Sequence, residues 1–228
     1  MKHGYTNDTA ADAASDADAT TVDKIYQGPD AELRLELELE MLTTLHERLP
    51  VPPVIATRVT TRTLTLGFVA GAHGQDLIDE GHAAEVLRSC GTLLRRLHDL
   101  DPVLLGFDEH AEGQVLVHGD FGPNNVLIDP ETFAVTALLD WEFAHLGDAI
   151  EDLAWCEWIV RTHHPDHVDA LADFFDAYGG HLPDWPQRQA AMVARCLELR
   201  SFCERWDPDS RGIQQWTDRA HATAGWRE

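Results

Sequence analysis

The segment VHGDFGPNNVLID, residues 117–129, decides the fold, because it sets polar side chains at fixed intervals beside short apolar runs. Asp120 lies five positions before Asn125, on a turn that leads into the apolar run VLI. A second brief apolar run, VTALLDW, begins at residue 135 and carries Asp140 near its end. The pattern predicts two short strands around a turn, with a loop before them that holds an acid and an amide.

These side chains match what phosphoryl transfer requires from a protein. Such a site supplies a carboxylate for the attacking hydroxyl, oxygen ligands for magnesium and a lysine for the phosphates. The chain has only two lysines against fifteen arginines. One of them, Lys24, lies in the partly β-branched run TTVDKIYQG, which predicts a strand ended by Gly28.

The rest of the chain alternates between extended and helical patterns. Segment 31–49 alternates at its start as a strand would, but its leucines keep helical spacing, so it predicts a helix that stops at Pro50. Residues 8–21 are rich in Ala, Asp and Thr and predict a loop. The other periodic segments predict strands at 54–60 and 62–69, a helix at 82–98 and broken helices within 148–228.

The spacing HxDxxxxN, followed by an apolar strand and an aspartate, is typical of the kinase catalytic loop and its metal-binding aspartate. With the runs LLDWEFAHLGDAIEDLAW and ELEMLTTLHERLPVPPVI, it resembles the aminoglycoside phosphotransferase-like family, also called the phosphotransferase enzyme family. The resemblance covers roughly residues 22–160 and implies an α+β, protein-kinase-like fold of two lobes. A small, truncated, β-rich lobe would occupy residues 1–69, and a larger, mainly helical lobe residues 70–228.

The resemblance also implies roles for the residues of the catalytic segments. Asp120 would be the catalytic base and His118 would brace its loop. Asn125 and Asp140 would bind Mg²⁺. Two acidic residues after the metal-binding pair would hold the loop and start a helix: Asp148 and Asp152.

The N-terminal lobe would bind ATP. Lys24, paired with Glu38 on the following helix, would contact the phosphates. The backbone of Gly67 and Val69, in the linker TLTLGFVAG, would meet the adenine. Only 23 residues precede Lys24, so the family's first strand is expected to be missing, with HGYTNDT as the remnant of its phosphate-covering loop. That remnant would offer two polar contacts, from Thr6 and Asn7.

Two alternatives compete with this interpretation. The shortened N-terminal lobe is also compatible with a pseudokinase-like nucleotide-binding or scaffold protein without turnover. A surface ion pair is nearly as good an explanation for Lys24 and Glu38 by themselves, because such pairs are common and contribute little. Core packing, rather than stacking on a substrate, is expected for four tryptophans: Trp155, Trp158, Trp185 and Trp206. A solvated loop, rather than a metal site, is expected for three histidines: His163, His164 and His167.

Composition limits the partners of the chain. A net charge of −23 disfavours nucleic acid and anionic membranes, because the surface repels phosphates. Neither a transmembrane run nor a signal peptide is evident, so the cytoplasm is expected. The expected partner is a small molecule with a hydroxyl group, either aminoglycoside-like or a metabolite alcohol, and no feature specifies an oligomeric state. The four cysteines lie far apart in the sequence with no CxxC pair, which favours reduced thiols over disulfides or a zinc site.

Overall fold

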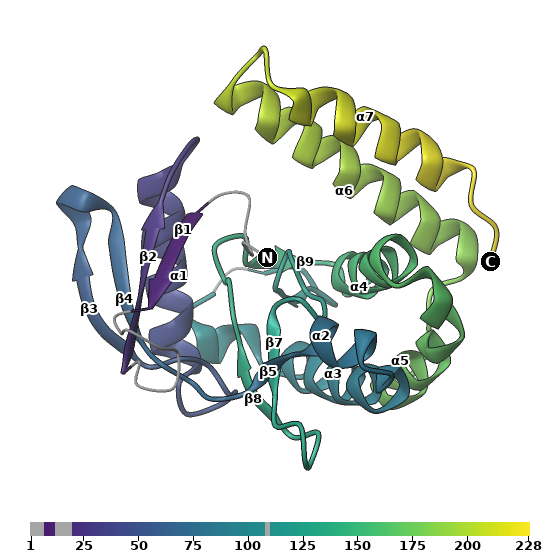
Figure 1. Cartoon of the computed structure of the whole chain (residues 1–228), viewed down its shortest axis with the longest axis horizontal. Helices are drawn as coiled ribbons and strands as arrows, with labels where there is room; N and C mark the ends of the chain where they lie inside the picture. The colour runs from purple at the N-terminus through teal and green to yellow at the C-terminus, as the bar shows by residue number, and fades with distance from the viewer. Residues whose placement is uncertain (1–6, 12–19, 108–109) are drawn as a thin grey trace.

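The computed structural model describes residues 7–11, 20–107 and 110–228, and these form two lobes (Figure 1). The smaller lobe is a four-stranded sheet with a long helix against it, and the larger lobe is mainly helical. The expected α+β fold with a small β-rich lobe is therefore confirmed. The boundary at residue 69 stays a prediction.

The strands and helices expected from the sequence are present in that order, together with short elements that the sequence did not predict. The smaller lobe contains β1 (Asn7–Ala11), β2 (Thr21–Tyr26), α1 (Ala31–Leu45), β3 (Val54–Arg58) and β4 (Thr63–Gly67). The larger lobe begins with β5 (Ala72–His73), α2 (Gly74–Asp79), α3 (Ala83–His98), β6 (Val115–Val117), β7 (Val126–Ile128), β8 (Val135–Leu138) and β9 (His145–Gly147). It ends with α4 (Ile150–His163), α5 (Leu171–Tyr178), α6 (Trp185–Trp206) and α7 (Arg211–Ala224), and short 3₁₀ turns connect some elements at Val59–Thr61, Pro102–Leu105 and Pro165–Ala170.

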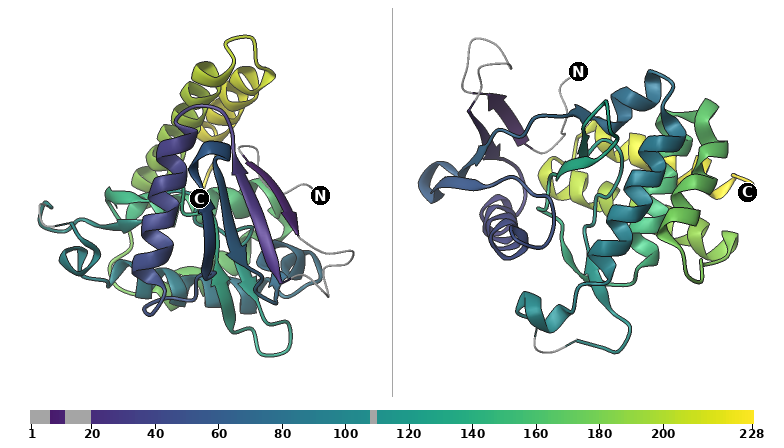
Figure 2. Two further views of the ribbon diagram at one scale, coloured as in Figure 1. Left: turned by 90° about the vertical axis from the view of Figure 1, so that its left-hand side faces the viewer. Right: turned by 90° about the horizontal axis from the view of Figure 1, so that it is seen from below.

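The sheet of the smaller lobe has the strand order β1-β2-β4-β3, with every neighbouring pair antiparallel. Helix α1 lies along one face of this sheet (Figure 2). The leucine spacing explains this packing, since Leu35, Leu42 and Leu45 are buried in a core that also contains Leu64 of β4. The helix ends at Leu45, earlier than the predicted stop at residue 49.

The predicted loop at residues 8–21 is wrong at its start. Asn7–Ala11 form strand β1, in register with β2 from Tyr26 to Val22. Ala and Asp have low strand propensity, so the pairing edge of β2, rather than local preference, accounts for this strand. Asn7 is thus the first residue of a strand and not part of a loop, and Thr6 lies outside the described residues.

The larger lobe packs its helices around two apolar clusters. One continues from the smaller lobe through α3, and the other lies between α4, α6 and α7. Trp158 belongs to the second cluster, where its ring stacks on Trp155 with centroids 4.5 Å apart and its indole N–H donates to Thr223 Oγ1 at 2.9 Å. The expectation that Trp158 packs in the core is confirmed.

The expectation of a solvated loop for the three histidines is wrong: His163 ends α4, and His167 lies in the 3₁₀ turn Pro165–Ala170. His164 is buried, and its Nδ1 lies 2.9 Å from Asp79 Oδ1 at the end of α2. The ring therefore connects α2 to the end of α4. No helix in the described part of the chain is long and apolar enough to cross a membrane.

A close helix crossing in the larger lobe depends on Gly91 of α3. A β-carbon at this position would lie 2.2 Å from the carbonyl oxygen of Phe174 on α5. We expect Gly91→Ala to lower the free energy of unfolding by about 1–3 kcal/mol, because the two helices must separate. Urea unfolding measures this change. The control is Thr92→Ala, at an exposed position of the same helix, and an equal effect in both variants would contradict the packing argument.

Candidate active site

The candidate site is built on the loop between β6 and β7. The side-chain amide of Asn125 donates from Nδ2 to the backbone oxygen of Asp120 at 2.8 Å and to its Oδ2 at 2.9 Å. The backbone of Asn125 turns back on Gly122 through an N–H to O bond of 3.0 Å. The loop thus folds on itself, which is why residues five positions apart in sequence share one site.

The second oxygen of Asp120 is held by a residue that the sequence did not assign to the site. Trp155 Nε1 donates to Asp120 Oδ1 at 2.7 Å. Its place one helical turn after Asp152 is the signal that could have indicated this contact. Burial raises the pKa of Asp120 above its usual range, although Arg195 and the two donors oppose this shift. Both carboxylate oxygens are therefore oriented before any substrate binds.

His118 connects the catalytic loop to the segment that ends in Asp140. Its Nε2 lies 2.8 Å from the carbonyl oxygen of Leu139, and its Nδ1 accepts the backbone N–H of Asp120 at 3.2 Å. This pattern requires a neutral ring with its proton on Nε2. Burial lowers the pKa of His118, which favours that neutral form.

Asp152, in the first turn of α4, anchors the start of the loop. Its fully buried carboxylate accepts the backbone N–H groups of His118 at 2.7 Å and Gly119 at 3.0 Å, and His98 Nε2 lies 3.2 Å away. Gly119 has a φ of 81°, and a β-carbon there would lie 2.4 Å from the carbonyl oxygen of Phe143. Burial opposes ionisation of Asp152, but these donors outweigh it and lower its pKa.

Asp148, expected to help hold the loop, is exposed. Its backbone N–H donates to Glu151 Oε1, and its carbonyl oxygen accepts the backbone N–H of Glu151 in the first turn of α4. Of the two acidic residues, Asp152 is the one that contacts the loop.

Lys24 joins the two lobes. Its ammonium lies 2.5 Å from Glu38 Oε2 on α1 and 2.8 Å from Asp140 Oδ1 in the larger lobe. Tyr26 donates its hydroxyl to the same Glu38 oxygen at 2.6 Å. Lys24 and Glu38 are 3% and 1% exposed, so the alternative of a surface ion pair is wrong.

The charges of this triad are coupled. Burial opposes protonation of Lys24, but Asp140 and Glu38 outweigh it and raise its pKa. Burial likewise opposes ionisation of Asp140, and Lys24 outweighs it and lowers the pKa of that carboxyl. The structure therefore holds an ammonium between two carboxylates.

The residues present fit a magnesium ion that is shared with substrate phosphates. Among the described residues, no group of three or more His, Cys, Asp or Glu side chains is arranged to hold a metal. Magnesium typically uses one or two protein carboxylates together with phosphates and water, so a full protein cage is not needed. Asp140, at a φ of 62° and with 40% of its side chain exposed, presents a carboxylate to the site. Because Asn125 directs its Nδ2 to Asp120, its Oδ1 is the amide atom left to ligate.

The predicted adenine contacts lie where the lobes connect. Gly67 ends β4, and its N–H donates to the carbonyl oxygen of Pro53 at 2.8 Å. Val69 is partly buried in the segment between β4 and β5. A second buried ion pair also joins the lobes, between Arg34 of α1 and Glu142, two residues after Asp140.

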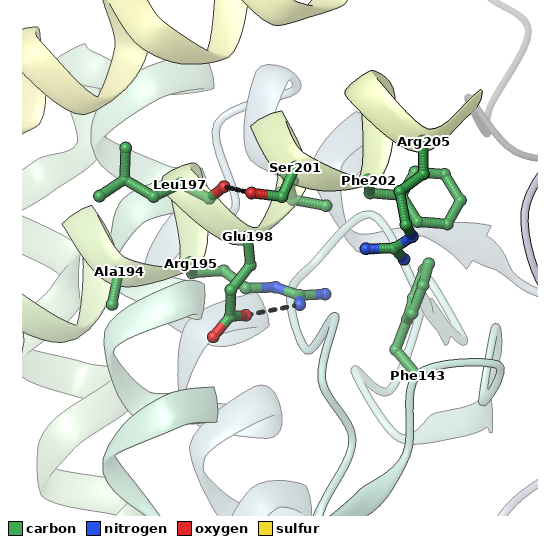
Figure 3. A pocket seen from close by; sticks show the side chains of 9 residues that line it. Phe143, Ala194, Arg195, Leu197, Glu198, Ser201, Phe202 and Arg205 are labelled. Carbon is green, nitrogen blue, oxygen red and sulfur yellow. Dashed lines mark hydrogen bonds and ion pairs between the residues drawn. The ribbon is translucent and has the colours of Figure 1, made fainter. Parts of the chain in front are cut away.

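A pocket opens beside the catalytic loop, between α6 and the segment after Asp140 (Figure 3). Arg195 of α6 donates from Nη2 to the carbonyl oxygen of Gly119 at 2.7 Å, next to Asp120. Its guanidinium also lies over the ring of Phe143, 5.3 Å from the centroid. The sequence did not indicate Arg195, because this contact joins residues 76 positions apart.

A sequence model of the phosphotransferase enzyme family matches residues 2–113 and 107–191. The chain therefore belongs to this family, and the resemblance seen in its catalytic segments is confirmed.

The chain is also similar to known proteins in sequence and in fold. The chain is 33% identical over 125 residues to a hygromycin-B 4-O-kinase of Escherichia coli, which is 53% of this chain and 31% of that protein. It superposes on an aminoglycoside 2'-phosphotransferase-IIIa in its GDP complex with a TM-score of 0.73 and 12% identity, over 98% of this chain and 91% of the other. A ternary complex of a mutant aminoglycoside phosphotransferase with AMP-PNP and hygromycin B gives a TM-score of 0.65 and 15% identity, over 98% and 91% of the two chains. The matched sequence is about a third of the length of the curated relatives, at 31% and 28% for the two first matches.

Asp152 provides a test of how the loop is held. Asp152→Asn should lower the free energy of unfolding by roughly 2–3 kcal/mol at about pH 7, because one backbone donor then faces an amide N–H₂. The lowered pKa means that the charge of Asp152 stabilises the fold above its usual value of 3.8, and this contribution is lost as the pH falls through the folded pKa. The difference between wild type and variant should therefore shrink at about pH 3.

Urea unfolding at both pH values measures this difference. Asp148→Asn, at the exposed position nearby, is the control and should change stability by less than about 0.5 kcal/mol. A pH-independent difference, or an equal loss in the control, would contradict the anchoring role of Asp152.

Proposed function

We propose that this chain is a kinase that moves the γ-phosphoryl group of ATP, with Mg²⁺, to a hydroxyl of a small molecule. The observation that carries the proposal is the pair of Asn125–Asp120 hydrogen bonds together with the Lys24 bridge from Glu38 to Asp140. A base, two metal ligands and a phosphate-binding cation are the parts that phosphoryl transfer needs.

Asp120 is the proposed base. The acceptor oxygen forms a bond to the γ-phosphorus while the bond from that phosphorus to the ADP oxygen breaks, and the hydroxyl proton passes to the Asp120 carboxylate. Asn125 and Trp155 keep the carboxylate oriented for this transfer. The raised pKa of Asp120 brings it closer to the operating pH, which makes it a better proton acceptor than a fully solvated aspartate.

Asn125 Oδ1 and Asp140 are the proposed magnesium ligands. The ion supplies neutralisation of the charge that develops on the phosphate oxygens. Lys24 contributes a second positive charge to the phosphates, while Glu38 and Tyr26 keep its side chain oriented. The adenine is proposed to contact the backbone of Gly67 and Val69. Further polar contacts with the nucleotide are proposed from Thr6 and Asn7.

The comparisons support this function through the proteins that they name. A hygromycin-B 4-O-kinase is among the matched sequences, and complexes with GDP and AMP-PNP are among the matched structures.

Replacing the base is the direct test of the chemistry. Asp120→Asn should lower kcat by about 10²–10⁴-fold, because an amide cannot accept the hydroxyl proton. Mass spectrometry measures the phosphate gained by an acceptor in the presence of ATP and Mg²⁺. Asp176→Asn, at an exposed site on α5, is the control and should keep wild-type turnover. Unchanged turnover in Asp120→Asn would exclude this residue as the base.

Replacing the metal ligand separates nucleotide binding from chemistry. Mg-ADP at about 100 times its Kd should stabilise the wild type by about 2.7 kcal/mol, which raises the unfolding midpoint by several degrees. Asp120→Asn should keep this shift and Asp140→Asn should lose most of it. No shift in the wild type would favour the alternative of a scaffold protein whose smaller lobe no longer holds ATP, and a full shift in Asp140→Asn would contradict its assignment as a ligand.

A further inference from the structure

The pocket beside the catalytic loop has a composition that restricts what the chain can phosphorylate. Its volume is about 520 Å³, within the range of small-molecule sites. Two residues that line it lie close to Gly119, the neighbour of Asp120. Arg195 donates a hydrogen bond to the carbonyl oxygen of Gly119, and Phe143 lies where a β-carbon of residue 119 would be. The full lining is Phe143, Ala194, Arg195, Leu197, Glu198, Leu199, Ser201, Phe202 and Arg205.

The pocket brings two arginines together in a chain whose net charge is −23. Two guanidinium groups line it, and each pairs with an exposed carboxylate: Arg195 with Glu198 at 3.0 Å, and Arg205 with Asp30 at 3.5 Å. Figure 3 shows both arginines extending from α6 toward the side where Phe143 lies. Because ion pairs with exposed partners contribute little, both guanidinium groups can exchange these carboxylates for that of an anionic ligand.

Arg195 is positioned to bind that anion. One end of its guanidinium is fixed on Gly119, and its Nη1 pairs with Glu198 Oε2 at 3.0 Å. The side chain of Glu198 is 63% exposed, while that of Arg195 is 20% exposed. A pair with such an exposed partner contributes little, so the carboxylate of a ligand can replace Glu198.

Apart from Ser201, whose hydroxyl donates to the carbonyl oxygen of Leu197, the remaining lining residues are apolar. The rings of Phe143 and Phe202 meet edge to face with centroids 6.0 Å apart. Leu197 is 45% exposed on the same helix. These surfaces favour a ligand with a hydrocarbon body rather than one covered with hydroxyl and ammonium groups.

We propose that the acceptor is a hydroxylated organic acid with an apolar body, whose carboxylate pairs with Arg195 while its hydroxyl faces Asp120. This rests on the kinase function proposed above and specifies its substrate class. The reaction forms the bond between the acceptor oxygen and the γ-phosphorus of ATP, releases ADP and passes the hydroxyl proton to Asp120. The carboxylate of the acceptor is unchanged. A polycationic amino sugar would instead place ammonium groups against two arginines, which costs binding energy through repulsion.

Matched acceptors test the charge preference directly. Mandelate, mandelamide and phenylethanolamine share a ring and a hydroxyl but carry an anionic, a neutral and a cationic group. Lactate, lactamide and isopropanolamine form a smaller aliphatic set. With ATP and Mg²⁺, we expect phosphate transfer to the acids with a kcat/KM at least about 10-fold above that of the amides, as expected for a charge-assisted hydrogen bond. The amines should be the poorest acceptors.

Two variants assign this preference to the pocket. Arg195→Gln should raise KM for mandelate by about 10–100-fold and change KM for mandelamide much less. Glu198→Gln removes the competing carboxylate and should lower KM for mandelate about two- to five-fold. Because the Glu198 side chain is exposed, this variant keeps the fold. Arg200→Gln, which alters an arginine of the same helix outside the pocket lining, is the control and should keep wild-type values.

The outcomes separate the two proposals. Transfer to amines or amides in preference to acids, or a KM for phenylethanolamine that rises in Glu198→Gln, would overturn the acid proposal and leave the kinase function standing. An equal rise of KM for mandelate and mandelamide in Arg195→Gln would also overturn it. Absence of transfer to every acceptor of all three charge types, with no stabilisation by Mg-ADP, would reject the kinase function itself.

Discussion

The structure depends on one ammonium group. Lys24 enters the site from β2 and is held between Glu38 of α1 and Asp140 of the larger lobe. A buried cation of this kind is stable only with close partners, because removing either one leaves a charge without compensation. The triad therefore fixes the helix against the sheet and one lobe against the other. The buried pair of Arg34 and Glu142 reinforces the same connection.

A second set of contacts, centred on Asp152, holds the loop that carries Asp120 in place. This carboxylate fixes the backbone at His118 and Gly119, and the ring of His118 then fixes both Asp120 and the carbonyl of Leu139. Asp120, the proposed base, and the segment that ends in Asp140, the proposed magnesium ligand, are thereby connected through one imidazole. Charge and geometry act together, since burial raises the pKa of Asp120 while its hydrogen bonds keep the carboxylate oriented.

Site contacts could be predicted from the sequence where the two residues lie close together along the chain, and not where they lie far apart. Asp120 and Asn125 were found from their spacing, because a short loop brings them together. Trp155 and Arg195 were not, since their contacts with the loop join residues 35 and 76 positions apart and depend on how α4 and α6 pack. Strand β1 was missed because its Ala and Asp residues have weak strand propensity and pairing with β2 supplies the order. For Lys24 and Glu38, the sequence left a surface ion pair as an alternative. Their burial excludes it, and burial depends on tertiary packing that local sequence does not specify.

We propose that Lys24 is a protonated, buried link between the lobes and that it contacts the phosphates of a nucleotide. The chain has only two lysines, so ¹⁵N labelling of lysine Nζ gives an NMR spectrum of two side-chain signals, and Lys24→Met assigns them. We expect the Lys24 signal to be that of an ammonium, to be protected from water, and to shift when Mg-ADP or Mg-AMP-PNP binds, while the Lys2 signal stays in place. A Lys24 signal that is solvent-exchanged, or that does not move at saturating nucleotide, would contradict this account.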